Sequence, residues 1–223
     1  MPPLVSIITV TLNRPSLRGT CDSIDRQTVG DWHHYVIGDG VSPAECRHPQ
    51  RSTIGFTRAL GATEPSADMP LGQPDPLLRW ALEHLDLGRF VCFLDDDNEY
   101  ERTFLARMLE ALSRSDAGIA LCALTFARLR DGRPYSDYRL DEDVEPPGLD
   151  GYPAWGRCDN SGFLTYSRLA REVGFPRSAP DNDLPSDVRF LRRLAEQFGW
   201  VRVPDRLVRY GVAPNTPPPV SRM

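Results

Sequence analysis

The chain contains no lysine, and all 26 of its basic residues are arginine. This absence excludes enzymes that form a Schiff base on lysine and nucleotide-binding proteins that need the lysine of a P-loop. No glycine-rich phosphate loop follows the first predicted strand, so a classical dinucleotide fold is not expected either. Any basic side chain that binds a phosphate or carboxylate must therefore be arginine or histidine. The planar guanidinium of arginine binds both groups through two parallel hydrogen bonds.

Cysteine and histidine are scarce as well. The five cysteines are odd in number, widely spaced and free of any CxxC pattern, which argues against a disulfide framework and a zinc knuckle. Cys92 and Cys122 lie inside apolar runs and are predicted to be small core residues. The four histidines are scattered along the sequence, so they are expected to be ordinary surface or core residues rather than a metal-binding set.

Long apolar runs and basic blocks are also missing. No stretch approaches the roughly 20 apolar residues of a membrane span, and the first residues lack the basic start and cleavage site of a signal peptide. We therefore expect a cytoplasmic protein that would reach a membrane only through a partner. The net charge of −5 without a basic block argues against nucleic acid as the main partner.

The sequence does contain alternating apolar segments of strand and helix length, which predict an α/β fold with a mostly parallel sheet. In the first half, strands are predicted at 4–10, 34–37, near 52–57 and at 90–94, and helices from 16 onward, at 75–85 and at 103–112. In the second half, strands are predicted at 119–130 and 133–140, helices at 167–173 and 188–198, and edge strands at 200–203 and 207–210. Ser16 is the predicted N-cap of the first helix.

Polar side chains follow three of the predicted parallel strands. Thr11, Asn13 and Arg14 follow the first strand, Asp39 follows the second, and the run 95–98, Asp-Asp-Asp-Asn, follows the fourth. The carboxyl ends of parallel strands meet at one edge of a sheet, where ligands bind. Neighbouring carboxylates repel one another, so the run predicts a divalent cation or several hydrogen-bond donors beside it.

Two known carboxylate motifs do not fit this run. An EF-hand loop would need glycine at Tyr100 and glutamate at Ala106. An aspartyl-phosphate phosphatase would carry its paired aspartates after the first strand, not after the fourth. A solvated turn that caps the helix near Thr103 is the simplest non-functional alternative.

Five segments, in their order and spacing, resemble the family-2 glycosyltransferases. They are residues 5–15, 24–28, the strand that ends at Asp39, 88–98 and 186–194. The resemblance covers nearly the whole chain. It implies a GT-A (Rossmann-like) α/β fold, in which helices flank a mostly parallel central sheet and a small β-hairpin region serves the acceptor. One domain over 1–212 is expected, with a nucleotide-binding half (1–100), an acceptor half (101–212) and a proline-rich tail (213–223).

The resemblance also implies a nucleoside-diphosphate sugar as donor, with UDP as the expected nucleotide. Asp39 matches the carboxylate that accepts the imide N–H of the base. The positions expected near the nucleoside or its phosphates are Thr11, Asn13, Arg14 and Arg79. Asp97 matches the metal ligand of the DxD motif, while Asp95 and Asp96 would hold ribose, sugar hydroxyls or metal-bound water, with Asp95 as a second candidate ligand. Mg²⁺ or Mn²⁺ suits an all-oxygen site that bridges a diphosphate.

Asp187 matches the base of inverting members of the family. It would take the proton of an acceptor hydroxyl as that oxygen attacks the anomeric carbon from the side opposite the diphosphate. Asp159 and Asn160 match a segment that borders the donor sugar and acceptor, and Trp155 suits either packing or stacking on a sugar. The acceptor is expected to be a hydroxyl-bearing small molecule, lipid-linked sugar or oligosaccharide.

The chain departs from the family pattern at two places. The usual Glu-Asp pair is Ser186-Asp187 here, and the arginine and histidine that often follow the late tyrosine are absent after Tyr210. These departures leave open a nucleotide-sugar-binding protein without turnover; a nucleotidyltransferase is a further alternative. Asp39 also suits an ordinary turn, Asp187 a helix N-cap at 188, and Arg14 and Arg79 plain surface positions. The lysine-free composition suggests a GC-rich bacterial source.

Overall fold

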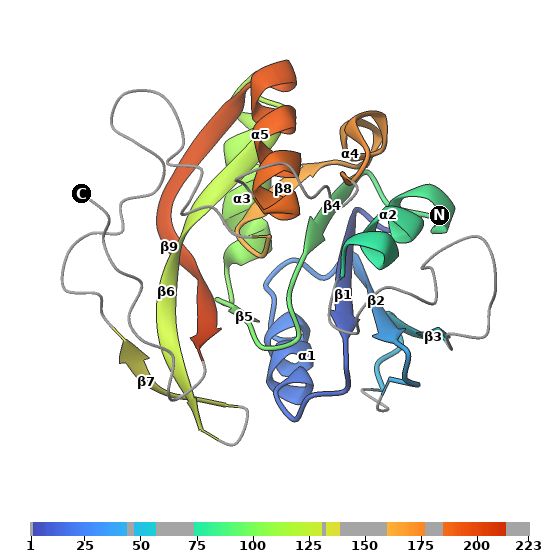
Figure 1. Cartoon of the computed structure of the whole chain (residues 1–223). Coiled ribbons are helices and arrows are strands. Elements are labelled where there is room, and N and C mark those ends of the chain that lie inside the picture. Colours follow the sequence, from blue (N-terminus) through green and yellow to red (C-terminus); the bar gives the residue numbers. More distant parts are fainter. Residues whose placement is uncertain are drawn as a thin grey trace.

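The computed structural model describes residues 2–43, 47–56, 74–130, 133–138, 160–176 and 185–212, and the side chains of 126–130, 133–138 and 212 are not described. Its helices are α1 (Leu17–Asp25), α2 (Asp75–His84), α3 (Phe104–Ser113), α4 (Ser167–Val173) and α5 (Ser186–Phe198). Its strands are β1 (Val5–Thr11), β2 (Trp32–Asp39), β3 (Arg51–Phe56), β4 (Phe90–Phe93), β5 (Glu99–Tyr100), β6 (Ile119–Arg130), β7 (Arg133–Tyr138), β8 (Phe163–Tyr166) and β9 (Trp200–Val212). The predicted α/β class is confirmed (Figure 1).

One curled sheet runs through the molecule in the order β3-β2-β1-β4-β8-β6-β9-β5, and β7 pairs with β6 (Figure 1). The strands β3, β2, β1 and β4 are parallel, whereas β8 is antiparallel to both β4 and β6. The register aligns Thr11 with Gly38 and Ile8 with Phe93. The residues that follow β1, β2 and β4 therefore meet at one edge of the sheet.

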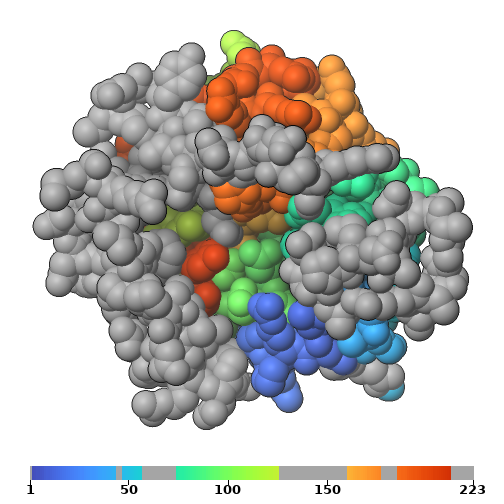
Figure 2. Space-filling model, in the orientation of Figure 1, coloured from blue at the N-terminus to red at the C-terminus, as the bar shows by residue number. Residues whose placement is uncertain are grey.

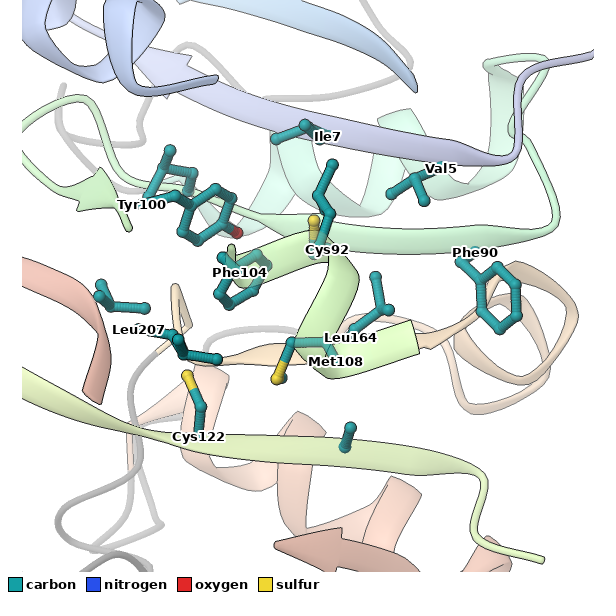
Figure 3. Close-up of a cluster of buried hydrophobic side chains, with 14 of the residues drawn as sticks. Val5, Ile7, Phe90, Cys92, Tyr100, Phe104, Met108, Cys122, Leu164 and Leu207 are labelled. Carbon is teal, nitrogen blue, oxygen red and sulfur yellow. The ribbon is translucent and has the colours of Figure 1, made fainter. Parts of the chain in front are cut away.

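Strand alternation divides the core between the two faces of the sheet. Val5, Ile7 and Cys92 pack with residues of α1 and α3, and Figure 3 shows side chains of this cluster from β1, β4, α3, β6 and β8 pointing toward one another. Ile8 and Phe93 point the other way, into a cluster with α2, α4 and α5. Helices on both faces explain why the central strands read as continuous apolar runs.

The strand β9 corrects one prediction. The two expected edge strands, 200–203 and 207–210, form a single strand that lies between β6 and β5 and pairs parallel with β6. Cys122 of β6 pairs with Val203, and the next residue, Ala123, pairs with Arg206. The register therefore passes over Pro204 and Asp205. A bulge thus accommodates the proline, which cannot donate a ladder hydrogen bond. The short strands β5 and β8 were not predicted.

Most other element boundaries agree with the predictions to within a few residues. Ser16 does precede α1, but its side chain makes no capping hydrogen bond. The helix α5 begins at Ser186 with Pro185 at the cap position, so Asp187 lies in its first turn and is not the N-cap. Residues 139–140 of the predicted strand 133–140 and the tail 213–223 lie outside the described residues.

A buried polar network ties β1, β2 and β3 together. Arg51 Nε donates to His34 Nδ1 at 2.8 Å, so the proton of the neutral ring must be on Nε2, which lies 2.9 Å from Thr9 Oγ1. Burial, followed by the charge of Arg51, lowers the pKa of His34 well below 6.5. His34 is therefore a neutral core histidine, and it secures the strands that end at Thr11 and Asp39.

Candidate functional site

A cavity of about 240 Å³ lies at the edge where β1, β2 and β4 end. Six residues predicted from the sequence line it: Thr11, Arg14, Asp39, Asp95, Asp96 and Asp97. Pro74 and Tyr210 also line it, although neither was among the predicted site residues. In Figure 2 segments coloured blue, green and red meet at the centre of the face, so distant parts of the chain converge there.

The turn after β1 places two of these side chains. Asn13 has a left-handed backbone with φ of 66°, which asparagine tolerates better than most residues. Its backbone N–H donates to Thr11 Oγ1 at 2.8 Å, and its Nδ2 donates to the Ser42 carbonyl at 2.9 Å. The hydroxyl proton of Thr11 therefore points away from Asn13, toward the acidic residues after β4.

The acidic residues are held by side chains from this turn. Thr11 Oγ1 donates to Asp96 Oδ2 at 2.6 Å, and Asp96 is only 4% exposed. Arg14 Nη1 lies 3.3 Å from Asp96 Oδ1 and 2.9 Å from Asp97 Oδ2. In the described contacts, these carboxylates bind Thr11 and Arg14, and Thr103 at the cap of α3 makes no side-chain capping bond. These contacts therefore do not support the alternative in which the acidic run is only a solvated turn that caps α3.

The pKa of Asp97 is raised above its usual value. Burial raises the pKa of Asp97, and the negative charge of Asp96 raises it further, while Arg14 and a backbone hydrogen bond act in the opposite direction. A bound cation would offset both causes of the increase. A second positive charge beside Asp97 would therefore stabilise its ionised form.

Asn98, the last residue of the polar run after β4 and one for which no role was predicted, fixes the position of the acidic residues. It is fully buried, and its Nδ2 donates to Ser161 Oγ at 2.7 Å and to Asp95 Oδ2 at 3.4 Å. Its Oδ1 accepts the N–H of Gly211 at 2.9 Å. Thr20 Oγ1 donates to its carbonyl at 2.8 Å. Asn98 therefore joins the end of β4 to α1, to the turn before β8 and to β9.

Asp39 ends β2 and is half-buried at the cavity wall. Two glycines shape this end of the strand. A Cβ at Gly38 would clash with the Val41 carbonyl and with Pro43, and Gly40 has φ of 69°. The close approach and the left-handed backbone both favour glycine, so the chain turns sharply here and leaves Asp39 at the cavity.

Asp187 lies in the first turn of α5 and is half-buried. Burial raises its pKa, with a smaller contribution from the negative charge of Asp75, while the backbone N–H groups of Val188 and Asp187 lower it. Asp75 is buried in the first turn of α2 and directly follows Pro74 at the cavity wall. Burial and the charge of Asp75 thus raise the pKa of Asp187 together, and Asp187 is not among the residues that line the cavity.

The remaining predicted site residues are placed differently. Arg79 donates to the carbonyls of Phe175 and Pro176 at 3.1 and 3.3 Å, and it does not line the cavity. Asn160 is 5% exposed, and its Oδ1 has no hydrogen-bond partner among the described atoms. Trp155 and Asp159 lie outside the described residues. Cys92 and Cys122 are buried free thiols, as predicted.

The donor set fits a hard divalent cation that shares its coordination with a ligand. Within the described ranges, no three His, Cys, Asp or Glu side chains form a complete metal site. Mg²⁺ characteristically takes only one or two carboxylates and completes its shell with water and phosphate oxygens. The Arg14 guanidinium already occupies a cation position between Asp96 and Asp97. Asp96 and Asp97 could therefore supply carboxylate oxygens to a cation that completes its shell with water or ligand oxygens.

No protein-family model and no curated protein matches the chain. Several solved structures, however, match the fold of this chain. TarS from S. aureus in complex with UDP has a TM-score of 0.63 at 14% identity, covering 96% of this chain and 61% of its own. TarS in complex with UDP-GlcNAc gives 0.60 at 15% identity, with 97% and 60% covered. The mannosyltransferase PcManGT from Pyrobaculum calidifontis, in complex with GDP-Man and Mn²⁺, gives 0.57 at 17%, with 98% and 58% covered.

These likenesses show the fold, and the chain spans about 60% of the length of those three chains. In the part of the chain that the structure describes, no helix is both long and apolar enough to cross a bilayer.

Proposed function

We propose that this protein is a glycosyltransferase that moves a sugar from a nucleoside diphosphate, with UDP as the expected carrier, to a hydroxyl group. The observation that supports it most is the single cavity that gathers Asp39, Arg14 and the acidic run at the carboxyl edge of the sheet. Solved structures with this fold include TarS in complex with UDP-GlcNAc and a mannosyltransferase in complex with GDP-Man and Mn²⁺. Residues 1–212 would act as one unit.

Each side of the cavity would bind a different part of the donor. Asp39 would accept the N–H of a uracil base, while Thr11, Asn13 and Arg14 would lie along the nucleoside and its phosphates. Asp97, with Asp95 as second candidate, would hold Mg²⁺ or Mn²⁺. The bound cation would neutralise the charge that develops on the departing diphosphate. Asp96, fixed by Thr11, would orient these groups.

Asp187 would act as the general base of an inverting transfer. A base works best when its pKa lies near the working pH, and burial together with Asp75 moves the pKa of Asp187 in that direction. Asp187 would accept the acceptor's hydroxyl proton while the C–O bond to the diphosphate breaks and the new bond forms on the opposite face. Arg79, Trp155, Asp159 and Asn160 remain weaker candidates for contacts with donor or acceptor.

A thermal-shift screen of nucleoside diphosphates and their sugars, with and without Mn²⁺, tests this function. A ligand at 100 times its Kd stabilises the native state by about 2.7 kcal/mol, so the correct nucleotide raises the Tm selectively and only with metal. Donor hydrolysis and transfer to acceptor pools then test turnover. Metal-dependent binding without any product would favour a nucleotide-sugar-binding protein, and pyrophosphate release would favour a nucleotidyltransferase.

A further inference from the structure

Arg14 makes the contact that this inference starts from. Its Nη1 reaches both Asp97 Oδ2, at 2.9 Å, and Asp96 Oδ1, at 3.3 Å. The arginine side chain is 50% exposed, whereas those of Asp97 and Asp96 are 26% and 5% exposed. A half-exposed positive charge therefore contacts two carboxylates that are largely withdrawn from water, at the place proposed for a divalent cation.

We propose that Arg14 occupies this cation position in the free protein and is exchanged for the divalent metal when a nucleoside diphosphate binds. The inference rests on the proposed function. Metal alone must displace the guanidinium, so it binds weakly. A diphosphate offers the guanidinium new anionic oxygens, which it binds bidentately, so its transfer leaves Asp96 and Asp97 to the metal. Metal and nucleotide then strengthen each other's binding, as linkage requires.

The surroundings of Arg14 permit this exchange. Arg14 also lines a second cavity, of about 490 Å³, beside α1, so open space lies on the other side of its side chain. The carboxylates keep a separate support when the guanidinium leaves. Asp96 Oδ2 stays bonded to Thr11 Oγ1, and the Asn98 hydrogen bonds hold the following backbone. Departure of Arg14 thus leaves an ordered pair of carboxylates that needs positive charge.

Direct measurement of Mn²⁺ binding by electron paramagnetic resonance, with and without UDP, tests the exchange independently of activity. Arg14→Gln removes the competing charge and keeps a polar side chain. Arg18→Gln is the matched control, because Arg18 is an exposed arginine on α1 that lines the second cavity but not the first. Arg14→Lys keeps the charge but loses the planar fork, and thermal melts verify that each variant folds.

We expect Arg14→Gln to bind Mn²⁺ about tenfold more tightly than the native chain without UDP, the scale of one charge-assisted contact. The gain in Mn²⁺ affinity on adding UDP shrinks correspondingly. The Mn²⁺ affinity of Arg14→Lys should lie between those of the native chain and Arg14→Gln. Arg18→Gln should bind Mn²⁺ as the native chain does.

Two results would overturn the exchange while leaving the proposed function intact. One is unchanged or weaker binding of Mn²⁺ alone by Arg14→Gln. The other is an equal gain in Arg18→Gln, which would reflect only the general charge of α1. If no chain binds Mn²⁺ either alone or with UDP, the exchange fails together with the metal site of the proposed function.

Discussion

Asp97 and Asp187 are two half-buried aspartates with different surroundings. Burial is the largest cause of the raised pKa in both. Asp97 has Arg14 at 2.9 Å and the charge of Asp96 beside it. For Asp187, the described influences that lower the pKa are backbone N–H groups, and the described side-chain charge that raises it is the like charge of Asp75.

This difference separates two kinds of chemistry. A buried carboxylate beside a second carboxylate is stabilised in its ionised form by a neighbouring positive charge, here that of Arg14. A buried carboxylate beside another carboxylate, without a strong opposing cation, has a greater tendency to take up a proton. Under the proposed function, two aspartates of similar burial would therefore take different roles, Asp97 as a metal ligand and Asp187 as a base.

Asp187→Asn should have the largest effect on turnover. Loss of a general base lowers kcat by roughly 10²- to 10⁴-fold, while Mn²⁺-dependent binding of UDP stays unchanged. The steady-state rate and the UDP affinity are measured on the same preparation. Glu196→Gln, an exposed change on the same helix, should affect neither. Full activity in Asp187→Asn would contradict the base assignment.

The same variant has an expected pH dependence of stability. The pKa of Asp187 is raised in the folded state, so the native protein binds this proton more tightly than the unfolded chain does. The resulting contribution to the free energy of unfolding is lost as the pH rises through the folded pKa. Asp187→Asn should therefore lose less stability between acid and neutral pH. Denaturant melts across that range measure the difference, and parallel curves for both chains would contradict it.

Asp97→Asn should weaken Mn²⁺ binding in the presence of UDP by roughly 100-fold, or about 2.7 kcal/mol, because the neutral amide is a poorer ligand for a hard cation. Calorimetry of Mn²⁺ with UDP present measures the loss. Asp116→Asn, an exposed change in the turn after α3, is the control. Unchanged Mn²⁺ affinity would exclude Asp97 as a ligand.

Asn98→Ala should destabilise the fold by about 2–3 kcal/mol, because its buried partners in the turn before β8 and on β9 lose their hydrogen bonds. It should also weaken Mn²⁺ binding several-fold, since the acidic residues lose their support. Met108→Ala, a core truncation in α3 with a comparable expected cost (Figure 3), separates the two effects. If both variants weaken Mn²⁺ equally, the loss follows from stability alone.

Asp75→Asn should have the smallest effect. Removing its charge lowers the pKa of Asp187, so the acid limb of the rate profile moves to lower pH while the plateau rate is unchanged. A pH–rate profile measures it. A limb that stays in place would mean that Asp75 does not influence the base.

The sequence predicted the strand ends well, because the register of parallel strands brings Thr11, Asp39 and Asp97 together whatever the loops between them do. It could not predict the role of Asn98, whose partners Ser161 and Gly211 are 63 and 113 residues away. Nor could it predict that β9 continues through Pro204, since only pairing with β6 provides the bulge. The closeness of Asp75 to Asp187 likewise depends on how α2 and α5 pack on one face of the sheet.

The most direct test of the two-carboxylate account is the binding of UDP, with and without Mn²⁺, to Asp97→Asn and Asp187→Asn side by side. The account predicts that Asp97→Asn loses the Mn²⁺-dependent gain in UDP affinity and that Asp187→Asn keeps it in full. The reverse pattern, or equal losses in both variants, would contradict the division of roles between these two residues.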